Sequence, residues 1–144
     1  MQVKRWAMVA TIGAVLVVSG CKQDDVKPVH HPARLEDSGT EGIKKVILEA
    51  RAVERTGIQT GTVREEMVGS VKRLVVPYGA IMYDPKGGVW TYTNPEPMVY
   101  VRHRIVVENV VGDRAILSEG PPAGTVIVTV GAAELMGAEH KYGH

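Results

Sequence analysis

The five histidines are the side chains of this 144-residue chain best suited to hold a transition metal. His30 and His31 are adjacent, and neighbouring side chains of an extended chain point to opposite sides, so both bind one ion only where the backbone wraps around it. His140 and His144 are four residues apart and would share one face of a helix, but Gly143 disfavours a helix there. These four histidines are therefore weak candidate metal ligands.

No residue pattern typical of catalysis accompanies the histidines. The signatures Gly-x-Ser-x-Gly and His-Glu-x-x-His do not occur. His103 falls in a predicted strand, on the face that also carries Val99 and Ile105, where a hydrogen-bonded buried imidazole or a strand-edge residue is expected rather than a general base. Gly87-Gly88 and Gly112-Asp113 serve turns, because neither opens a helix with a lysine behind it. We expect a protein that is not an enzyme and has no cofactor.

Cys21 is the only cysteine, and the residues before it have the three parts of a secretory signal. Lys4-Arg5 gives a charged start, residues 6–18 are mostly apolar, and Ser19-Gly20 is a pair of small residues. The apolar run is too short for a membrane-spanning helix, which needs roughly 20 residues. The small residues followed by cysteine resemble the lipobox of bacterial lipoproteins. This resemblance implies that residues 1–20 are a signal peptide and that Cys21 carries lipid, with acyl chains such as palmitate.

Two other interpretations of Cys21 remain open: a stray thiol beside an ordinary secretory signal, or an uncleaved N-terminal anchor. Lipidation would consume the only thiol, so no disulfide would form and the fold would depend on its own core. More than one acyl chain anchors stably, because each buried methylene adds about 0.8 kcal/mol. We expect the protein in the cell envelope, anchored to the inner or outer membrane and facing the periplasm.

The charge balance argues against nucleic acid as a partner. Lys4 and Arg5 are two of the 17 basic residues, so 15 remain against 16 acidic residues once the signal is removed. Nucleic-acid-binding proteins normally carry a basic patch or stripe, and only short basic pairs such as Lys44-Lys45 and Lys72-Arg73 occur here. The remaining length fits one small domain.

Residues 21–45 are predicted to be a flexible tether between the lipid and this domain. The segment is polar, contains Asp24-Asp25, and is interrupted by Pro28 and Pro32. It has too few apolar groups to offset the entropy of ordering it.

Residues 46–139 are predicted to form a small, mainly β domain with one or two short helices, followed by a tail at residues 140–144. Helix formers at residues 49–56 stop at Gly57, which predicts a short helix. Asp84-Pro85-Lys86-Gly87-Gly88 predicts a hairpin turn. About seven short strands are expected.

The clearest alternation predicts one continuous strand over residues 99–107. A period of two indicates one apolar and one mixed face. The apolar face consists of alternate residues: Val99, Val101, His103, Ile105 and Val107.

The large side chains are expected mainly in the core. Trp90 and Tyr92 share one face of a predicted strand, where core packing is expected and an exposed interface anchor is the alternative. Met67, Met82 and Met98 are dispersed along the chain and are expected to fill the core.

The order of several segments resembles the membrane-proximal domain of periplasmic adaptors, or membrane fusion proteins, of resistance-nodulation-division efflux systems. The resemblance lies in an apolar strand followed by a short helix and a Gly57-Ile58 step, the Pro77-containing strand end, the Asp84–Gly88 hairpin and the strands after it. The matching segments are residues 46–63, 75–81, 84–92, 101–107 and 126–135. The resemblance implies a β-roll or barrel-like domain that binds an inner-membrane efflux pump or a full-length adaptor and is accessory to efflux.

Two departures limit what this resemblance implies. Only eleven residues separate Val63 from Val75, where a full-length adaptor has a lipoyl-like domain, a coiled-coil hairpin and much of a β-barrel. The loop at residues 120–125 also lacks the usual leucine and acidic residue. Two alternatives remain: an envelope lipoprotein that handles a transition metal through His30, His31, His140 and His144, and a structural remnant without a pump contact.

Overall fold

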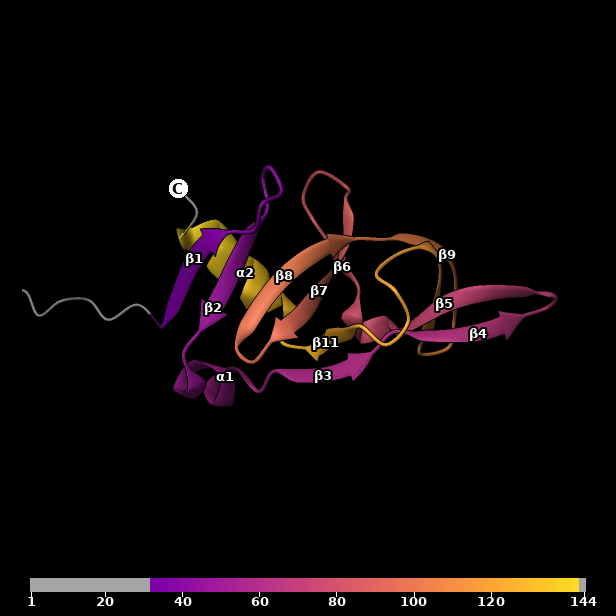
Figure 1. The fold of residues 1–144 in the computed structure, drawn as a ribbon, viewed down its shortest axis with the longest axis horizontal. Helices are drawn as coiled ribbons and strands as arrows, with labels where there is room; N and C mark the ends of the chain where they lie inside the picture. The colour runs from indigo at the N-terminus through magenta and orange to yellow at the C-terminus, as the bar shows by residue number, and fades with distance from the viewer. Residues whose placement is uncertain (1–31, 143–144) are drawn as a thin grey trace, which may run out of the picture.

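The computed structural model describes residues 32–142, which form a mainly β fold, as predicted. This range contains eleven strands, two α-helices and one 3-10 turn, arranged as in Figure 1. The strands are β1 (Ala33–Asp37), β2 (Lys44–Leu48), β3 (Gln59–Thr62), β4 (Arg64–Val68), β5 (Val71–Pro77), β6 (Met82–Tyr83), β7 (Val89–Glu96), β8 (Val99–Arg104), β9 (Val106–Val111), β10 (Arg114–Glu119) and β11 (Val126–Val130). The helices are α1 (Ala50–Thr56), the 3-10 turn η1 (Tyr78–Ala80) and α2 (Ala132–Tyr142).

The strands form two antiparallel sheets that lie along the long axis of the molecule (Figure 1). The seven-stranded sheet has the order β1-β2-β8-β7-β11-β3, and β6 pairs with β7 beside this path. The four-stranded sheet has the order β4-β5-β10-β9 and lies at the opposite end from β1 and α2. Its β4–β5 hairpin projects outward and turns at Gly69-Ser70, since Val68 pairs with Val71.

Each sheet contributes to its own apolar core. Helix α2 packs against the seven-stranded sheet, and the buried residues there are Ala33, Val46, Leu48, Ala52, Tyr92, Tyr100, Val128, Ala132 and Leu135. The second cluster lies towards the four-stranded sheet and contains Val63, Val76, Ala80, Ile105, Ala115, Leu117 and Ile127. Ile127 and Val128 are neighbours on β11 and point to opposite faces, so this strand joins the two cores.

The prediction of a tether over residues 21–45 is wrong from Ala33 onward. Strand β1 pairs with β2 from Ala33 opposite Leu48 to Asp37 opposite Lys44. Ala33 is buried and Leu35 packs beside it in the core under α2. Strand β1 has few apolar residues of its own. It is stabilised by backbone hydrogen bonds with β2 and by apolar contacts with α2, about 100 residues later in the chain. Residues 21–31 of the predicted tether lie outside the described range.

The prediction of one continuous strand over residues 99–107 is also wrong. The strand breaks at Ile105, between β8 and β9. On β8 the buried face carries Tyr100 and largely buried Arg102, whereas His103 on the supposed apolar face is exposed. The alternation was correct, but the assignment of its faces was not, because a charged side chain lies inward.

The predicted end of the first helix is confirmed, and the predicted C-terminal tail is wrong in part. Helix α1 ends at Gly57, whose φ of 65° and amide hydrogen bonds to the Val53 and Glu54 carbonyls form the expected glycine stop. The predicted tail at residues 140–144 is wrong over its first part, because α2 continues to Tyr142. Burial of Leu135 and Glu139 stabilises a helix that is short and contains Gly137.

Two glycines near α2 should respond to alanine in opposite directions. Gly131 has φ 91°, and a Cβ there would lie 2.7 Å from Ile58 Cγ1, so Gly131→Ala is expected to lower the free energy of unfolding by about 2 kcal/mol. Gly137 lies inside the helix with nothing within 4 Å of such a Cβ, so Gly137→Ala should raise it by about 0.5–1 kcal/mol. Urea unfolding measures the free energy of unfolding of both variants. Changes of the same sign in the two variants would contradict the prediction.

Candidate functional site

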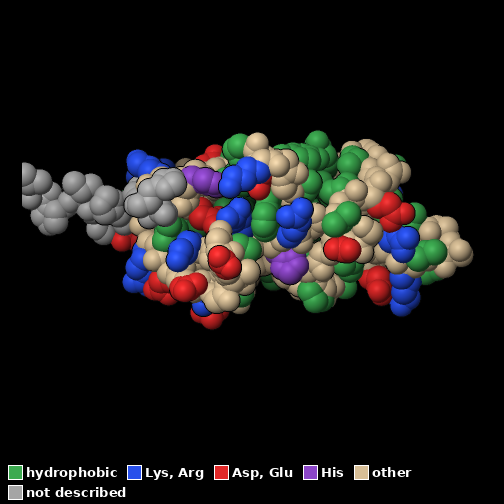
Figure 2. Space-filling view, turned by 90° about the horizontal axis from the view of Figure 1, so that it is seen from above, with side chains coloured by type: hydrophobic (Ala, Val, Ile, Leu, Met, Phe, Trp, Pro, Cys, Tyr) green, Lys and Arg blue, Asp and Glu red, His purple; other side chains and the backbone are tan. Residues whose placement is uncertain are grey.

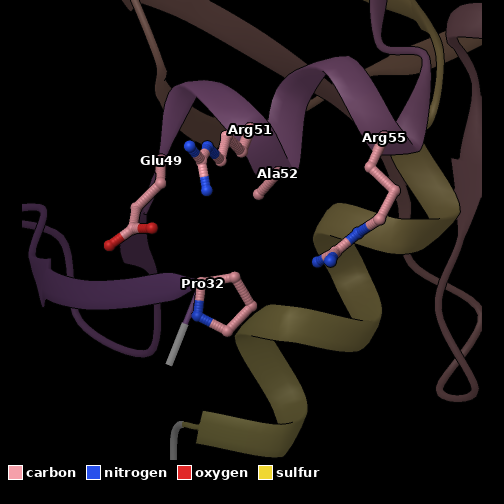
Figure 3. A pocket seen from close by; sticks show the side chains of 5 residues that line it. All are labelled: Pro32, Glu49, Arg51, Ala52 and Arg55. Atoms are coloured by element: carbon pink, nitrogen blue, oxygen red, sulfur yellow. The ribbon is translucent and has the colours of Figure 1, made fainter. Parts of the chain in front are cut away.

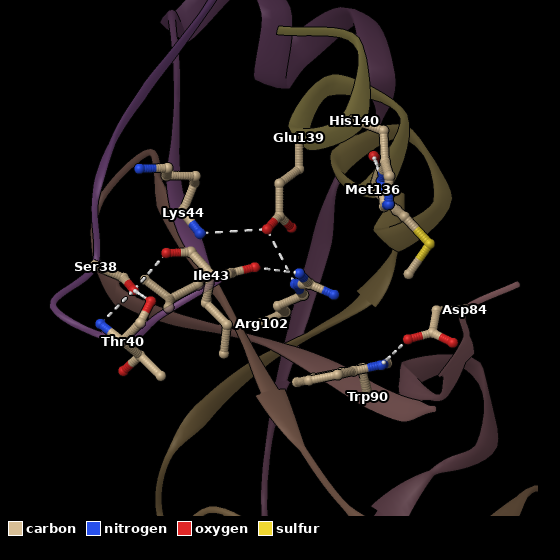
Figure 4. A network of polar contacts seen from close by, with 12 residues as sticks. Ser38, Thr40, Ile43, Lys44, Asp84, Trp90, Arg102, Met136, Glu139 and His140 are labelled. Atoms are coloured by element: carbon tan, nitrogen blue, oxygen red, sulfur yellow. Dashed lines mark hydrogen bonds and ion pairs between the residues drawn. The ribbon is translucent and has the colours of Figure 1, made fainter. Parts of the chain in front are cut away.

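A surface pocket of about 620 Å³ opens between the β6–β7 turn, β8 and the end of α2. We call it the Trp90 pocket. Its lining residues are Asp84, Pro85, Lys86, Gly87, Gly88, Trp90, Arg102, Arg104 and His140. Figure 4 shows Asp84 and Trp90 on one side and Arg102 and His140 on the other. The pocket therefore combines an indole ring with several basic side chains.

The turn that forms one wall is organised around the Asp84 carboxylate. Its Oδ1 accepts hydrogen bonds from the backbone amides of Lys86 at 2.8 Å and Gly88 at 2.7 Å, and its Oδ2 accepts one from Trp90 Nε1 at 2.8 Å. The hydrogen bond from the Gly88 amide, followed by that from the Trp90 indole N–H, lowers the pKa of Asp84. Burial opposes this shift, and Lys86 and Arg102 add smaller lowering contributions. A Cβ on Gly88 would lie 2.6 Å from both Asp84 Oδ2 and Trp90 Nε1, so only glycine allows this arrangement.

Two arginines from β8 lie over the Trp90 ring. Arg104 pairs with Trp90 across the strands, and Arg102 is two residues earlier on the same face. The guanidinium carbons lie 4.6 Å (Arg102) and 5.8 Å (Arg104) from the ring centroid, within the range of cation–π attraction. The indole, fixed by Asp84, thus orients both cations.

Behind the pocket, the buried carboxylate of Glu139 connects α2 to β2, β7 and β8, and Figure 4 shows its contacts with Lys44 and Arg102. It accepts hydrogen bonds from Tyr92 Oη at 2.7 Å, Arg102 Nε at 3.0 Å and the Lys44 backbone amide at 3.3 Å. Arg102 also donates to the Gly42 carbonyl at 2.6 Å. Because Glu139 is 5% and Arg102 14% exposed, this is a largely buried ion pair that fixes α2 against the sheet.

Tyr92 should make stability depend on pH in alkaline solution. Burial, followed by the hydrogen bond and charge of Glu139, raises the pKa of Tyr92 well above its ordinary value. The neutral phenol therefore contributes its full stability below about pH 10, where the unfolded tyrosine begins to ionise, and this stability falls by about 1.4 kcal/mol per pH unit above it. Tyr92→Phe removes that dependence.

The measurement is urea unfolding of the protein and of Tyr92→Phe at pH 8 and pH 11. We expect the difference in unfolding free energy between the two to shrink at the higher pH. Burial also raises the pKa of Tyr100, but Tyr100 is present in both proteins and cancels in the comparison. A difference that is the same at both pH values would contradict the role of Tyr92.

Only some of the predicted site residues lie within the range that the structure describes. Cys21, His30, His31 and His144 lie outside the described range. His140 is exposed on α2 and lines the Trp90 pocket, and its Nδ1 donates a hydrogen bond to the Met136 carbonyl at 2.8 Å. Within residues 32–142, no group of three or more His, Cys, Asp or Glu side chains could hold a metal ion. The same part of the chain contains no helix long and apolar enough to cross a membrane.

The predicted core positions of the methionines and aromatic residues are partly confirmed. Tyr92 is fully buried and Met82 packs against the first core, but Met67 and Met98 are exposed. Met67 lies on the projecting β4–β5 hairpin, whose tip no other element covers in Figure 1.

A second pocket, of about 570 Å³, lies between α1, the start of β1 and α2 (Figure 3). Its lining residues are Pro32, Glu49, Arg51, Ala52 and Arg55. Figure 3 shows Arg51 and Arg55 extending from α1 towards the space, with Pro32 on the opposite side. It offers no aromatic surface.

Comparison with known proteins gives one structural similarity. No protein-family model matches the sequence, and no curated protein sequence matches it. Among solved structures, the chain is similar to the NMR structure of a 180-residue fragment of SilB from Cupriavidus metallidurans CH34, which comprises the N-terminal metal-binding site and the membrane-proximal domain. The two are 17% identical, with a TM-score of 0.46 over 88% of this chain and 89% of that chain.

Sequence reasoning missed the basic side of the Trp90 pocket. The sequence predicts the Asp84 turn and the strand that carries Trp90, but it places Arg102 and Arg104 only on the mixed face of a strand. A signal was present, since two arginines alternate on one strand opposite a strand that carries Trp90 and Tyr92.

Proposed function

We propose that this protein is a non-enzymatic, adaptor-like protein of the cell envelope, which binds an inner-membrane efflux pump or its full-length adaptor. The main support is the pairing between strands from the two segments that resemble the adaptor domain. Strands β2 and β3 precede the eleven residues between Val63 and Val75, and β8 and β11 follow them. Strand β2 pairs with β8, β3 pairs with β11, and all four strands belong to one sheet. A domain closed in this way has no need of the inserted domains to complete its core.

The hairpin β4–β5 stands where the resemblance implies the long insertion. Strand β4 begins at Arg64, directly after buried Val63, and β5 returns into the four-stranded sheet through buried Val75 and Val76. The eleven residues thus form a short projection instead of an arm. This favours a role in docking at one membrane, and it is inconsistent with a bridge between two membranes.

We further propose that Cys21 is the lipid anchor of this protein. The proposal is supported by the charged, apolar and small-residue segments that precede the cysteine. Detergent-phase partitioning with Triton X-114 should place the wild-type chain in the detergent phase and Cys21→Ser in the aqueous phase. Equal partitioning of both would reject the anchor.

The partner is tested by crosslinking in native cells, with a C-terminal tag and Cys21 intact. Recovery of an inner-membrane efflux pump or a full-length adaptor is expected, and the crosslinked peptides identify the docking face. Recovery of neither would reject the proposal. The metal-handling alternative is separated by thermal unfolding with and without a chelator, because a bound metal raises the unfolding temperature and its removal lowers it.

A further inference from the structure

We propose that the Trp90 pocket binds side-chain carboxylates on an acidic segment of a protein partner. This inference rests on the proposed function in one respect, since it requires that the protein has a protein partner. It names the chemistry of the contact, which the proposed function leaves open.

The charge of the pocket supports an anionic ligand. Lys86 and Arg104 line it, both are exposed, and within residues 32–142 neither forms an ion pair. Arg102 is already neutralised by Glu139, behind the pocket. Figure 2 shows Lys and Arg side chains interspersed with Asp and Glu on the face seen from above. An arriving carboxylate would therefore meet unpaired cations.

The donors that remain free favour a carboxylate over a phosphate group. A glycine-containing turn binds phosphate through its backbone amides, but here the amides of Lys86 and Gly88 already donate to Asp84. The free donors are the guanidinium of Arg104 and the ammonium of Lys86, and a guanidinium forms two parallel hydrogen bonds to a planar carboxylate.

The pocket is preorganised for a protein ligand. Trp90 is fixed by Asp84, and Arg102 is fixed by Glu139 and the Gly42 carbonyl, so these two walls of the pocket are in place before a ligand binds. Tryptophan and arginine are the residues enriched at the centres of protein interfaces. The volume of about 620 Å³ accommodates a few side chains of a peptide.

The test is a titration of the full chain with a capped heptapeptide that contains four acidic residues. Trp6→Phe is introduced so that Trp90 is the one indole, and its Nε1–H signal is followed by NMR. We expect a saturable shift of this signal. Arg104→Gln should weaken binding about tenfold, since a charge-assisted hydrogen-bond pair is lost. Arg64→Gln is the matched control: it removes one positive charge from an exposed position on β4, which belongs to the four-stranded sheet and does not line the Trp90 pocket, and should change binding less than about twofold.

Further binding and crosslinking measurements could overturn the proposal. The same heptapeptide with Gln and Asn in place of its acidic residues should not bind, and equal binding would overturn it. Inorganic phosphate, or vesicles of phosphatidylglycerol and phosphatidylethanolamine at 1:3, should not produce an Arg104-dependent shift, and such a shift without peptide binding would assign the pocket to a phosphate headgroup instead. If the peptide binds but no pump or adaptor is crosslinked, the proposed partner is rejected and the pocket proposal stands. If Arg104→Gln is crosslinked to a pump as well as the unsubstituted protein is, the pocket proposal is rejected and the proposed partner stands.

Discussion

Glu139→Leu is expected to lower the free energy of unfolding by about 3–5 kcal/mol. The substitution leaves Arg102, which is 14% exposed, without the carboxylate that now lies 3.0 Å from its Nε. It also leaves Tyr92 Oη without its acceptor. Removing one partner of a buried ion pair costs more than removing both, because the remaining charge is desolvated and unpaired.

Urea unfolding measures this effect against a matched control. Glu108 also accepts a hydrogen bond from an arginine, at 2.6 Å from Arg73 Nε, but this pair is exposed to solvent. Glu108→Leu should therefore cost no more than about 1 kcal/mol. Combining Glu139→Leu with Arg102→Met should recover part of the loss. Equal costs for the two glutamates, or no recovery in the double variant, would show that the pair around Glu139 does not stabilise the fold.

Leu135→Ala is expected to lower the free energy of unfolding by about 3 kcal/mol. Leu135 is fully buried in the core that α2 shares with the seven-stranded sheet, so its truncation leaves a cavity among residues from β1, β2, β7 and β11. The loss should appear as a lower urea midpoint with an unchanged slope.

The control for Leu135 is an exposed neighbour on the same helix. Glu134→Ala removes a first-turn acidic residue and should cost about 0.5 kcal/mol, from its interaction with the helix dipole. If Leu135→Ala and Glu134→Ala had similar small effects, α2 would not be part of the core, and the view of residues 140–144 as a tail would regain support.

Elements whose stability is local were predictable from the sequence. The Asp84 turn depends on one proline, two glycines and a carboxylate within five residues, and all of these are visible in the sequence. The stop of α1 at Gly57 depends on one residue with positive φ. The end of β5 at Pro77 follows in the same way from the fixed φ and missing amide of proline.

Elements stabilised by distant partners were not predictable. Strand β1 looks too polar to fold until its pairing with β2 and its contact with α2 are known. Arg102 looks like a surface residue until Glu139, 37 residues later, supplies its charge partner. The basic side of the Trp90 pocket is not predictable for the same reason, since Arg102 and Arg104 lie on the mixed face of the predicted strand and their contacts with Trp90 and Glu139 come from other segments.

The packing of α2 on β1 and β2 also constrains when folding can finish. Leu48 and Leu135 belong to one core but are 87 residues apart in the chain. Helix α2 is the last element of the described chain, so it is synthesised after both strands, and in an exported protein it also crosses the membrane after them. Until then β1 and β2 have no helix to cover their apolar face. The N-terminal strands must therefore wait for the last residues of the domain, and the nascent chain exposes this surface to chaperones and to aggregation until the helix arrives.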